Sequence, residues 1–170
     1  MKTIEIKVYK LEELDKQTRE KVIENYRYIN VEDMNWWEFV QYNLKDFYNI
    51  ELLEFNLDRG YSVNINIKSE LFEVCENIIR EKTYFHFILS EAKSYVEKYN
   101  EIQSNNKEDE VIEQLVEQLD YESNIEKHIE NSILKSLNCE WEYYISDEAV
   151  IDTIEANDYN FTWNGEIFKL

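Results

Sequence analysis

The sequence predicts an α+β protein in which several helices cover an antiparallel sheet. Apolar residues recur every three or four positions through most of the chain, which is typical of helices, and they alternate in a few short stretches, which is typical of strands. The 170 residues include no proline and only two glycines, so long helices and few tight turns are expected. The predicted order is β-α-α-β-β-α-α-α-α-α-β-β. We expect the N-terminal strand, a central hairpin and a C-terminal hairpin to share one antiparallel sheet.

The N-terminal part begins with a strand and continues with two helices. Residues 3–9 alternate between apolar and polar, and this period of two predicts a half-buried strand. From Leu11 the apolar residues follow a helical period, and Asp15 or Thr18 could shape the first turns of that helix. A second helix is expected over 31–49. Its wide apolar stripe consists of Met34, Trp37, Phe39, Val40, Leu44, Phe47 and Tyr48.

A hairpin and two further helices make up the middle of the chain. Two extended runs, 50–57 and 61–68, flank the segment 58–60, and a glycine-containing turn between extended runs predicts a β-hairpin. Ser69 is expected to be the N-cap of the helix that follows, because its hydroxyl can accept a backbone hydrogen bond. Another helix is expected over 83–102.

The run QSNNKED at 103–109 predicts a loop and is the one candidate sub-boundary in the sequence. It separates an α+β part, 1–102, from an acidic helical part with the C-terminal hairpin, 108–170. The length fits one domain, so we expect residues 1–170 to form a single α+β domain with this possible subdivision.

The C-terminal part is predicted to be helical and to end in a hairpin. Helices are expected over 111–119, 125–145 and 147–156. Ser146 is a suitable N-cap for the last of these, and two acids in its first turn match the helix dipole. Asn164-Gly165 lies between two short aromatic runs, which is a strong local signal for a hairpin.

The charge of the chain restricts its function. The sequence holds 37 acids against 18 bases, a formal net charge of −19, and direct nucleic-acid binding would need a basic stripe that is not present. Aromatic residues make up 15%, which disfavours a disordered acidic tail. The N-terminus lacks the apolar core of a signal peptide, and no apolar run is long enough to span a membrane. A cytoplasmic protein is therefore expected.

No catalytic or metal-binding pattern is found in the sequence. His86 and His128 are the only histidines, and neither lies in a metal-binding motif. Phosphate-binding loops and nucleophile elbows are also missing, and with 37 acids a carboxylate pair arises by chance everywhere. Cys75 and Cys139 are interpreted as buried small hydrophobes, because they have no CxxC spacing. We expect no enzyme activity, no cofactor and no metal.

Acidic residues are the candidate functional residues. Between Ser136 and Phe168 the chain carries eight carboxylates and no lysine or arginine. Carboxylates three or four residues apart on a helix lie about 5–6 Å apart, a spacing close enough to that of phosphates for the row to occupy a groove built for nucleic acid. The predicted partner-binding residues are Glu140, Glu142, Asp147, Glu148, Asp152, Glu155, Asp158, Glu113, Glu117 and Asp120, together with Trp36.

Both parts of this prediction have a structural alternative. A charge run is usually a solvated, solubilising helix surface. For the pair Trp36-Trp37 the alternative is favoured, with Trp37 anchoring the core while Trp36 lies partly exposed. The functional interpretation of Trp36 is a tryptophan at a partner interface, where this residue type is enriched.

Both ends of the chain resemble a diffuse family of small acidic proteins from bacteriophages and prophages. The resemblance is carried by 6–14, Lys21 to Arg27 and Trp36-Trp37-Glu38 at one end and by 142–159 at the other, about half of the chain. The family has no catalytic motif, and some members carry antitoxin-like labels. The resemblance implies a phage or mobile-element protein in a bacterial cytosol. In size and charge the chain is also similar to anti-CRISPR and anti-restriction proteins.

The leading hypothesis is therefore a non-enzymatic inhibitor of a bacterial defence nuclease, such as a CRISPR effector, that binds the basic nucleic-acid groove through a nucleic-acid-mimicking acidic surface. One alternative is an antitoxin-like or regulatory binder of a basic partner protein. A second is a hydrolase that uses clustered carboxylates with a divalent metal, and a third is a phage structural or accessory protein.

Overall fold

The computed structural model describes residues 6–32, 35–58, 60–81, 85, 88–104 and 111–168, and for 111–121 it describes the backbone alone. The chain divides into two compact units. Unit 1 comprises Met1–Trp36 and Glu140–Leu170, and unit 2 comprises Trp37–Cys139. The division thus falls at 36/37 and 139/140 and not at the loop predicted over 103–109, most of which lies outside the described residues. The single-domain organisation stays a prediction.

Unit 1 is built from both ends of the chain. A short 3-10 helix, Leu11–Glu13, precedes α1, Lys16–Asn25, and the C-terminal segment supplies α6, Asp147–Ala156. Asp15 is the N-cap of α1, because its carboxylate accepts hydrogen bonds from the backbone N–H groups of Gln17 and Thr18. The core residues are Leu11, Val22, Ile23, Val150, Ile154 and Phe161. Burial of these apolar side chains therefore joins α1 to α6.

The predicted sheet is wrong in its extent. The N-terminal run contributes an isolated bridge from Tyr9 to Phe161, and the C-terminal aromatic run contributes a second from Phe161 to Ile167. Within the described residues the one regular sheet is the two-stranded hairpin of unit 2. The terminal runs hydrogen-bond to each other because their apolar residues enter the small core of unit 1, and residues 1–5 lie outside the described part.

Unit 2 contains the predicted central hairpin, formed by β1, Ile50–Asn56, and β2, Ser62–Ile67, which pair antiparallel. A register shift between Leu52 and Glu54 makes Leu53 a bulge. This extra residue is needed because a strict alternation would turn Glu54 toward the apolar face. With the bulge, Leu52 pairs with Ile65 on the apolar face and Glu54 pairs with Asn64 on the polar face.

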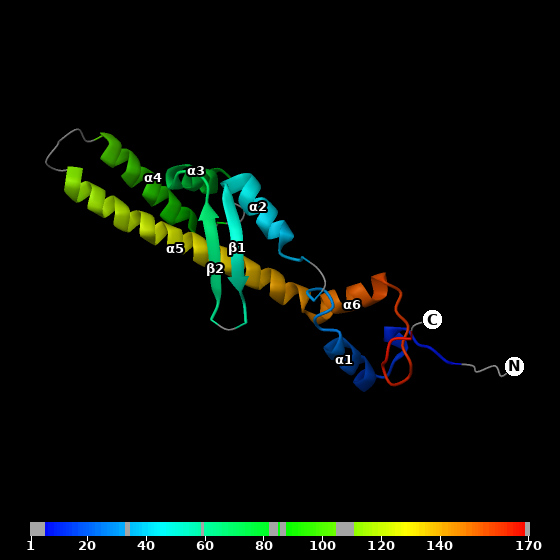
Figure 1. Cartoon of the computed structure of the whole chain (residues 1–170). Helices are drawn as coiled ribbons and strands as arrows, with labels where there is room; N and C mark the ends of the chain where they lie inside the picture. Colours follow the sequence, from blue (N-terminus) through cyan, green and yellow to red (C-terminus); the bar gives the residue numbers. More distant parts are fainter. Residues whose placement is uncertain are drawn as a thin grey trace. The chain divides into compact units, whose positions relative to one another are not determined.

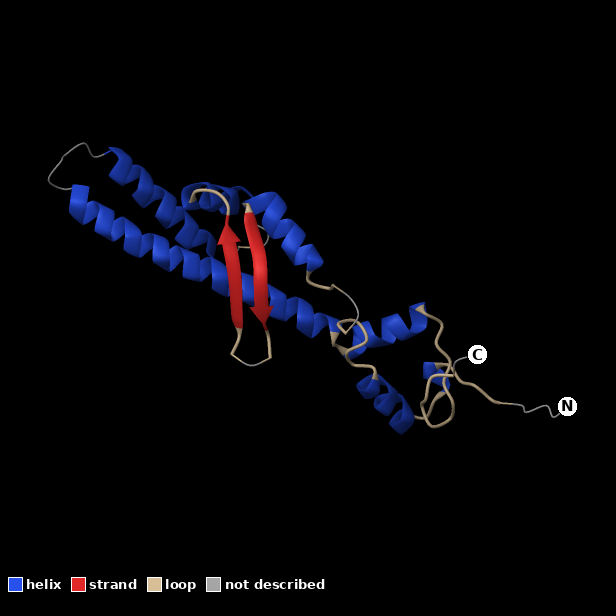
Figure 2. Ribbon diagram, in the orientation of Figure 1, coloured by secondary structure: helices blue, strands red, loops and turns tan. Residues whose placement is uncertain are grey.

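Helices cover this hairpin and supply the core of unit 2 (Figures 1 and 2). They are α2, Glu38–Tyr48; α3, Leu71–Glu81; α4, Leu89–Ser104; and α5, Val111–Tyr144. Helix α2 packs on β1 and α3, and α3 packs on α4. Buried aliphatic residues recur at a spacing of four along α5, which is the stripe expected of a core helix. They are Ile125, Ile129, Ile133 and Leu137.

Helix positions were predicted better than helix ends. Residues 111–119 and 125–145, expected as two helices, form the single helix α5. The helix expected over 31–49 begins at Glu38, directly after a turn at residues 36–37. Ser69 is not an N-cap, since its buried hydroxyl has no hydrogen-bond partner among the described residues. The prediction for residues 147–156 is confirmed, because the Ser146 hydroxyl accepts a hydrogen bond from the backbone of Ala149.

The α+β class is confirmed, since the described residues form helices and one antiparallel hairpin. Cys75 is buried as predicted, and desolvation raises the pKa of its thiol to about 12, so the thiol stays protonated. Cys139 is exposed, so the prediction that it is buried is wrong. Among the helices of the described residues, none combines the length and the apolar character needed to cross a membrane.

Candidate functional site

The exposed face of α6 carries the most continuous row of predicted acids. Val150 and Ile154 are buried in the core, which turns the opposite side of the helix to solvent. Glu148, Asp152 and Glu155 are exposed on that side, at spacings of four and three residues. Side chains at these spacings are neighbours on a helix, about 5–6 Å apart at Cβ. We call these three residues the α6 acidic row.

Two of the predicted acids are neutralised by bases that the sequence did not place beside them. Lys10 Nζ lies 2.6 Å from Asp158 Oδ1, and Arg27 Nη2 lies 2.9 Å from Asp147 Oδ1. The hydrogen bond from Arg27 to Glu24, and to a smaller extent that to Asp147, raises the pKa of Arg27. The expectation of an uncompensated stretch from 136 to 168 is therefore partly wrong. Both bases come from the N-terminal segment, more than 100 residues away in sequence.

The α6 acidic row has no such partner in the described part of the chain. None of its three carboxylates forms an ion pair with a described base. Folding therefore leaves three neighbouring carboxylates on one side of α6 without an ion-pair partner among the described bases. An anionic row of this kind attracts a cationic surface and increases the rate of association at low ionic strength.

Side chains from the loop after α1 hold the junction of α5 and α6. Arg27 Nη1 donates to the backbone carbonyl of Ile145 at 2.9 Å, and Asn30 Nδ2 donates to the carbonyls of Tyr144 and Ala149. The hydroxyl of Thr153 donates to Asn30 Oδ1 at 2.6 Å. Carbonyls at a helix C-terminus lack partners within the helix, so these bonds fix where α5 ends and how α6 begins.

The other predicted residues lie elsewhere. Glu140 is half-buried and Glu142 is exposed near the end of α5, while the side chains of Glu113, Glu117 and Asp120 lie outside the described residues. Trp36 is buried, and its ring centroid lies 5.8 Å from that of Trp141. The sequence predicted that Trp37 lies in the core and that Trp36 is partly exposed. The structure reverses them, because Trp36 packs in an aromatic cluster with Trp141 and Tyr144, so its ring is not available to a partner.

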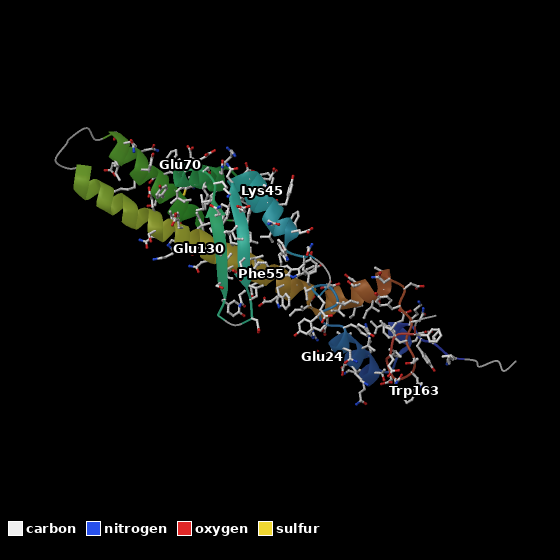
Figure 3. The ribbon with its side chains drawn as sticks, in the orientation of Figure 1. Glu24, Lys45, Phe55, Glu70, Glu130 and Trp163 are labelled. Carbon is white, nitrogen blue, oxygen red and sulfur yellow. The ribbon has the colours of Figure 1, made fainter. Side chains whose placement is uncertain are left out.

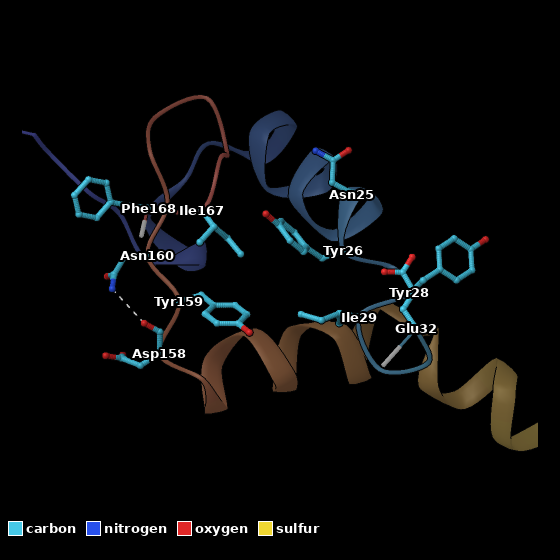
Figure 4. Close-up of a pocket in the computed structure, with 10 residues that line it drawn as sticks. All are labelled: Asn25, Tyr26, Tyr28, Ile29, Glu32, Asp158, Tyr159, Asn160, Ile167 and Phe168. Carbon is cyan, nitrogen blue, oxygen red and sulfur yellow. Dashed lines mark hydrogen bonds between the residues drawn. The ribbon is translucent and has the colours of Figure 1, made fainter. Parts of the chain in front are cut away.

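An aromatic groove of about 430 Å³ lies in unit 1 between the end of α1 and the C-terminal segment (Figure 4). The rings of Tyr26 and Tyr159 and the side chains of Ile29 and Ile167 point toward its centre (Figure 4). The remaining lining residues are Asn25, Tyr28, Glu32, Asp158, Asn160 and Phe168. We call this cavity the Tyr159 groove.

A second groove, of about 400 Å³, lies beside the α6 acidic row. It includes Asp152 of that row together with two tyrosines from the end of α5, and we call it the Tyr143 groove. Its lining residues are Asn30, Tyr143, Tyr144, Ala149, Asp152, Thr153, Ala156 and Asn157. Accessible apolar surface predominates in it, so it combines an aromatic wall with one carboxylate.

Trp163 at the C-terminal turn is 76% exposed (Figure 3). The turn that carries it is fixed, because the N–H of Gly165 donates to the carbonyl of Thr162 and the N–H of Thr162 donates to the carbonyl of Glu166. A Cβ on Gly165, whose φ is +86°, would lie 2.8 Å from a methyl group of Val22, so this glycine allows the turn to approach α1.

A groove of about 360 Å³ lies in unit 2 between α4 and α5, lined by Glu91, Ser94, Tyr95, Asn124, Ile125 and His128. Tyr95 is buried and its hydroxyl donates to Glu122 at 3.2 Å. Desolvation, and to a smaller extent the charge of Glu122, raises the pKa of Tyr95.

His128 is exposed, as expected for a solvated helix face, and His86 lies outside the described residues. Among the described residues no three His, Cys, Asp or Glu side chains are grouped to hold a metal.

Comparisons of the chain with models of protein families, with curated proteins and with solved structures find no match. The assignment of a function therefore depends on the surface chemistry of the two units. The sequence predicted the acids of α6, because their helical spacing can be recognised from neighbouring residues. It missed the Tyr159 groove and the Tyr143 groove, because their walls come from segments more than 100 residues apart.

Proposed function

We propose that this protein is a non-enzymatic inhibitor that binds a basic, nucleic-acid-binding groove of a bacterial defence nuclease, such as a CRISPR effector. The α6 acidic row enters that groove in place of phosphates. The partner is a protein, and the acid excess of the chain opposes direct binding to nucleic acid or to an anionic membrane.

One observation carries the proposal: Glu148, Asp152 and Glu155 are exposed in a continuous row that no described base neutralises. In an ordinary solvated helix, lysines are interspersed with the acids and form pairs at i,i+4. Helix α6 has three further supports for such a role. It is capped by Ser146, anchored by Val150 and Ile154, and held at its start by Asn30. The row is thus presented on a fixed surface.

The test is a charge reversal with a matched control. The variant Glu148→Lys/Asp152→Lys/Glu155→Lys is compared with Glu73→Lys/Glu76→Lys/Glu97→Lys, which makes the same charge change at exposed positions of unit 2. Each protein is added to a panel of purified CRISPR effectors and restriction enzymes loaded with labelled DNA. We expect the unchanged protein and the unit 2 variant to displace DNA from at least one nuclease, and the α6 variant to lose this ability.

Circular dichroism establishes that both variants are folded before they are compared. Inhibition should also weaken steeply with rising salt, because the binding is electrostatic. Full inhibition by a folded α6 variant would overturn the proposal for this surface.

An antitoxin-like binder of a basic toxin would use the same acidic row. The two functions differ in the partner. Displacement of nucleic acid from a defence nuclease supports the inhibitor. No effect on any nuclease of the panel, combined with neutralisation of a basic toxin encoded beside this gene, would instead establish the antitoxin-like function.

A further inference from the structure

We propose that the Tyr143 groove is a socket for one arginine side chain of the basic partner. This inference rests on the proposed function, since it names the group of the partner that the acidic surface recognises. The groove borders the α6 acidic row through Asp152, so a cation attracted by the row meets the groove directly. Its volume of about 400 Å³ lies at the small end of ligand sites, about 300–1,000 Å³, and suits a single long side chain.

The aromatic wall of the socket is available for stacking. The ring of Tyr143 is 57% exposed, and its centroid lies 5.5 Å from that of Tyr144 with the planes at 66°. In this edge-to-face arrangement Tyr144 can cover at most one face of the Tyr143 ring. A guanidinium over the other face is attracted by the ring quadrupole, by about 0.5–1 kcal/mol at an exposed site.

The polar floor of the socket is already satisfied within the protein. Asn30 uses its amide hydrogens on two backbone carbonyls and accepts the hydroxyl proton of Thr153 on its oxygen. Asn157 Nδ2 donates to the carbonyl of Thr153 at 2.8 Å. The amide hydrogens of Asn30 and the hydroxyl hydrogen of Thr153 are thus not available to an anionic or neutral polar ligand. The Asp152 carboxylate forms no ion pair with a described base, so it is the group that selects the charge of the occupant.

Arginine fits this combination better than lysine. A guanidinium is planar, so it can stack on the Tyr143 ring while its edge donates two hydrogen bonds to the Asp152 carboxylate. An ammonium group has no flat face, and it is more strongly hydrated. Ala149 and Ala156, whose side chains are single methyl groups, leave room for the methylene stem of the occupant.

The test uses the whole protein and two blocked peptides, Gly-Arg-Gly and Gly-Lys-Gly, in an NMR titration. We expect the arginine peptide to shift the signals of Tyr143, Asp152 and Ala156, with a dissociation constant about fivefold lower than that of the lysine peptide, as 1 kcal/mol of additional attraction implies. Asp152→Asn and Tyr143→Leu should each remove this preference. Tyr143→Phe keeps the ring and should retain it.

The matched control is Glu155→Gln, which makes the same charge change on the same helix at a position outside the groove. It should weaken both peptides equally and leave the preference for arginine intact. Equal binding of the two peptides, or signal shifts spread evenly along α6, overturns the socket. That result leaves the proposed function standing if nuclease inhibition still depends on the α6 acidic row. Conversely, a preserved arginine preference without inhibition of any nuclease supports the socket and contradicts the proposed function.

Discussion

The two units carry a similar acid excess but hold it in different ways. Unit 1 contains 16 acids and 8 bases, and unit 2 contains 21 acids and 10 bases. In unit 1, two described ion pairs join the N-terminal segment to the C-terminal segment. In unit 2 the described ion pairs join residues closer in sequence, Arg80 with its neighbour Glu81 and Lys68 with Glu51 across the hairpin. Ion pairs therefore link the two ends of the chain in unit 1 and nearby segments in unit 2.

The interiors of the two units also differ in how far they depend on polar contacts. Unit 2 has a long aliphatic stripe on α5 that is buried in its interior. Unit 1 has a small apolar core, and the buried amide of Asn30 makes three hydrogen bonds at its edge. We infer that apolar burial mainly determines the fold of unit 2. In unit 1, polar contacts between segments distant in sequence also help to determine the fold.

The largest effects should come from cavities in the two cores. Ile133→Ala in unit 2 and Ile154→Ala in unit 1 each remove a fully buried side chain and should each cost about 2–5 kcal/mol of unfolding free energy. Native-state hydrogen exchange reports the two units separately. We expect each variant to accelerate exchange mainly in its own unit. Equal acceleration throughout the chain would show that the units unfold together and would remove the basis for comparing them.

A pair of glycine substitutions compares a crowded turn with an open one. Gly165 in unit 1 has a φ of +86° and no room for a Cβ, whereas Gly60 in unit 2 has a φ of +98° and nothing within 4 Å of that position. Gly165→Ala should cost about 2–4 kcal/mol, from backbone strain together with overpacking against Val22. Gly60→Ala should cost about 1 kcal/mol, from strain alone. Urea unfolding measures both, and equal costs would contradict the close approach of this turn to α1.

Two buried polar side chains should respond in opposite directions. Asn30→Ala leaves the carbonyls of Tyr144 and Ala149 without their donor and should cost about 2 kcal/mol. Ser132 on α5 is buried and its hydroxyl has no hydrogen-bond partner in the described part of the chain, so Ser132→Ala should be neutral or stabilising by up to about 1 kcal/mol. Thermal unfolding of the two variants provides the comparison. A destabilised Ser132→Ala protein would reveal a hydrogen bond to that hydroxyl.

The sequence predicted what is encoded locally. Ser146 and the acids after it placed α6 correctly, and the glycine turn at 58–60 placed the hairpin of unit 2, because caps and turns depend on adjacent residues. The sequence did not predict that Lys10 neutralises Asp158, since 148 positions separate them. It also could not divide the acids into paired and unpaired ones, which is the distinction that defines the α6 acidic row. Tertiary contacts between the two ends of the chain make that distinction.

The smallest effect is the acid dependence of the N-cap of α1. The Asp15 carboxylate accepts hydrogen bonds from the hydroxyl and backbone N–H of Thr18 and from the N–H of Gln17, and these bonds lower its pKa below the ordinary value of 3.8. Because the folded pKa is the lower one, the cap stabilises unit 1 above the unfolded pKa. This contribution is lost as the pH falls through the folded pKa. The 13C shift of the Asp15 carboxyl should therefore titrate below 3.8.

Asp15→Asn sharpens this test, because an asparagine can still cap the helix but does not titrate. The variant should flatten the acid-induced decline in the stability of unit 1 below the unfolded pKa while leaving unit 2 unchanged. Glu51 is the matched group in unit 2. Its pKa is also lowered, chiefly by the hydrogen bond from Lys68, so Glu51→Gln should alter the acid response of unit 2 alone. If Asp15→Asn changed both units equally, the acid sensitivity of the protein would come from its overall charge and not from local contacts.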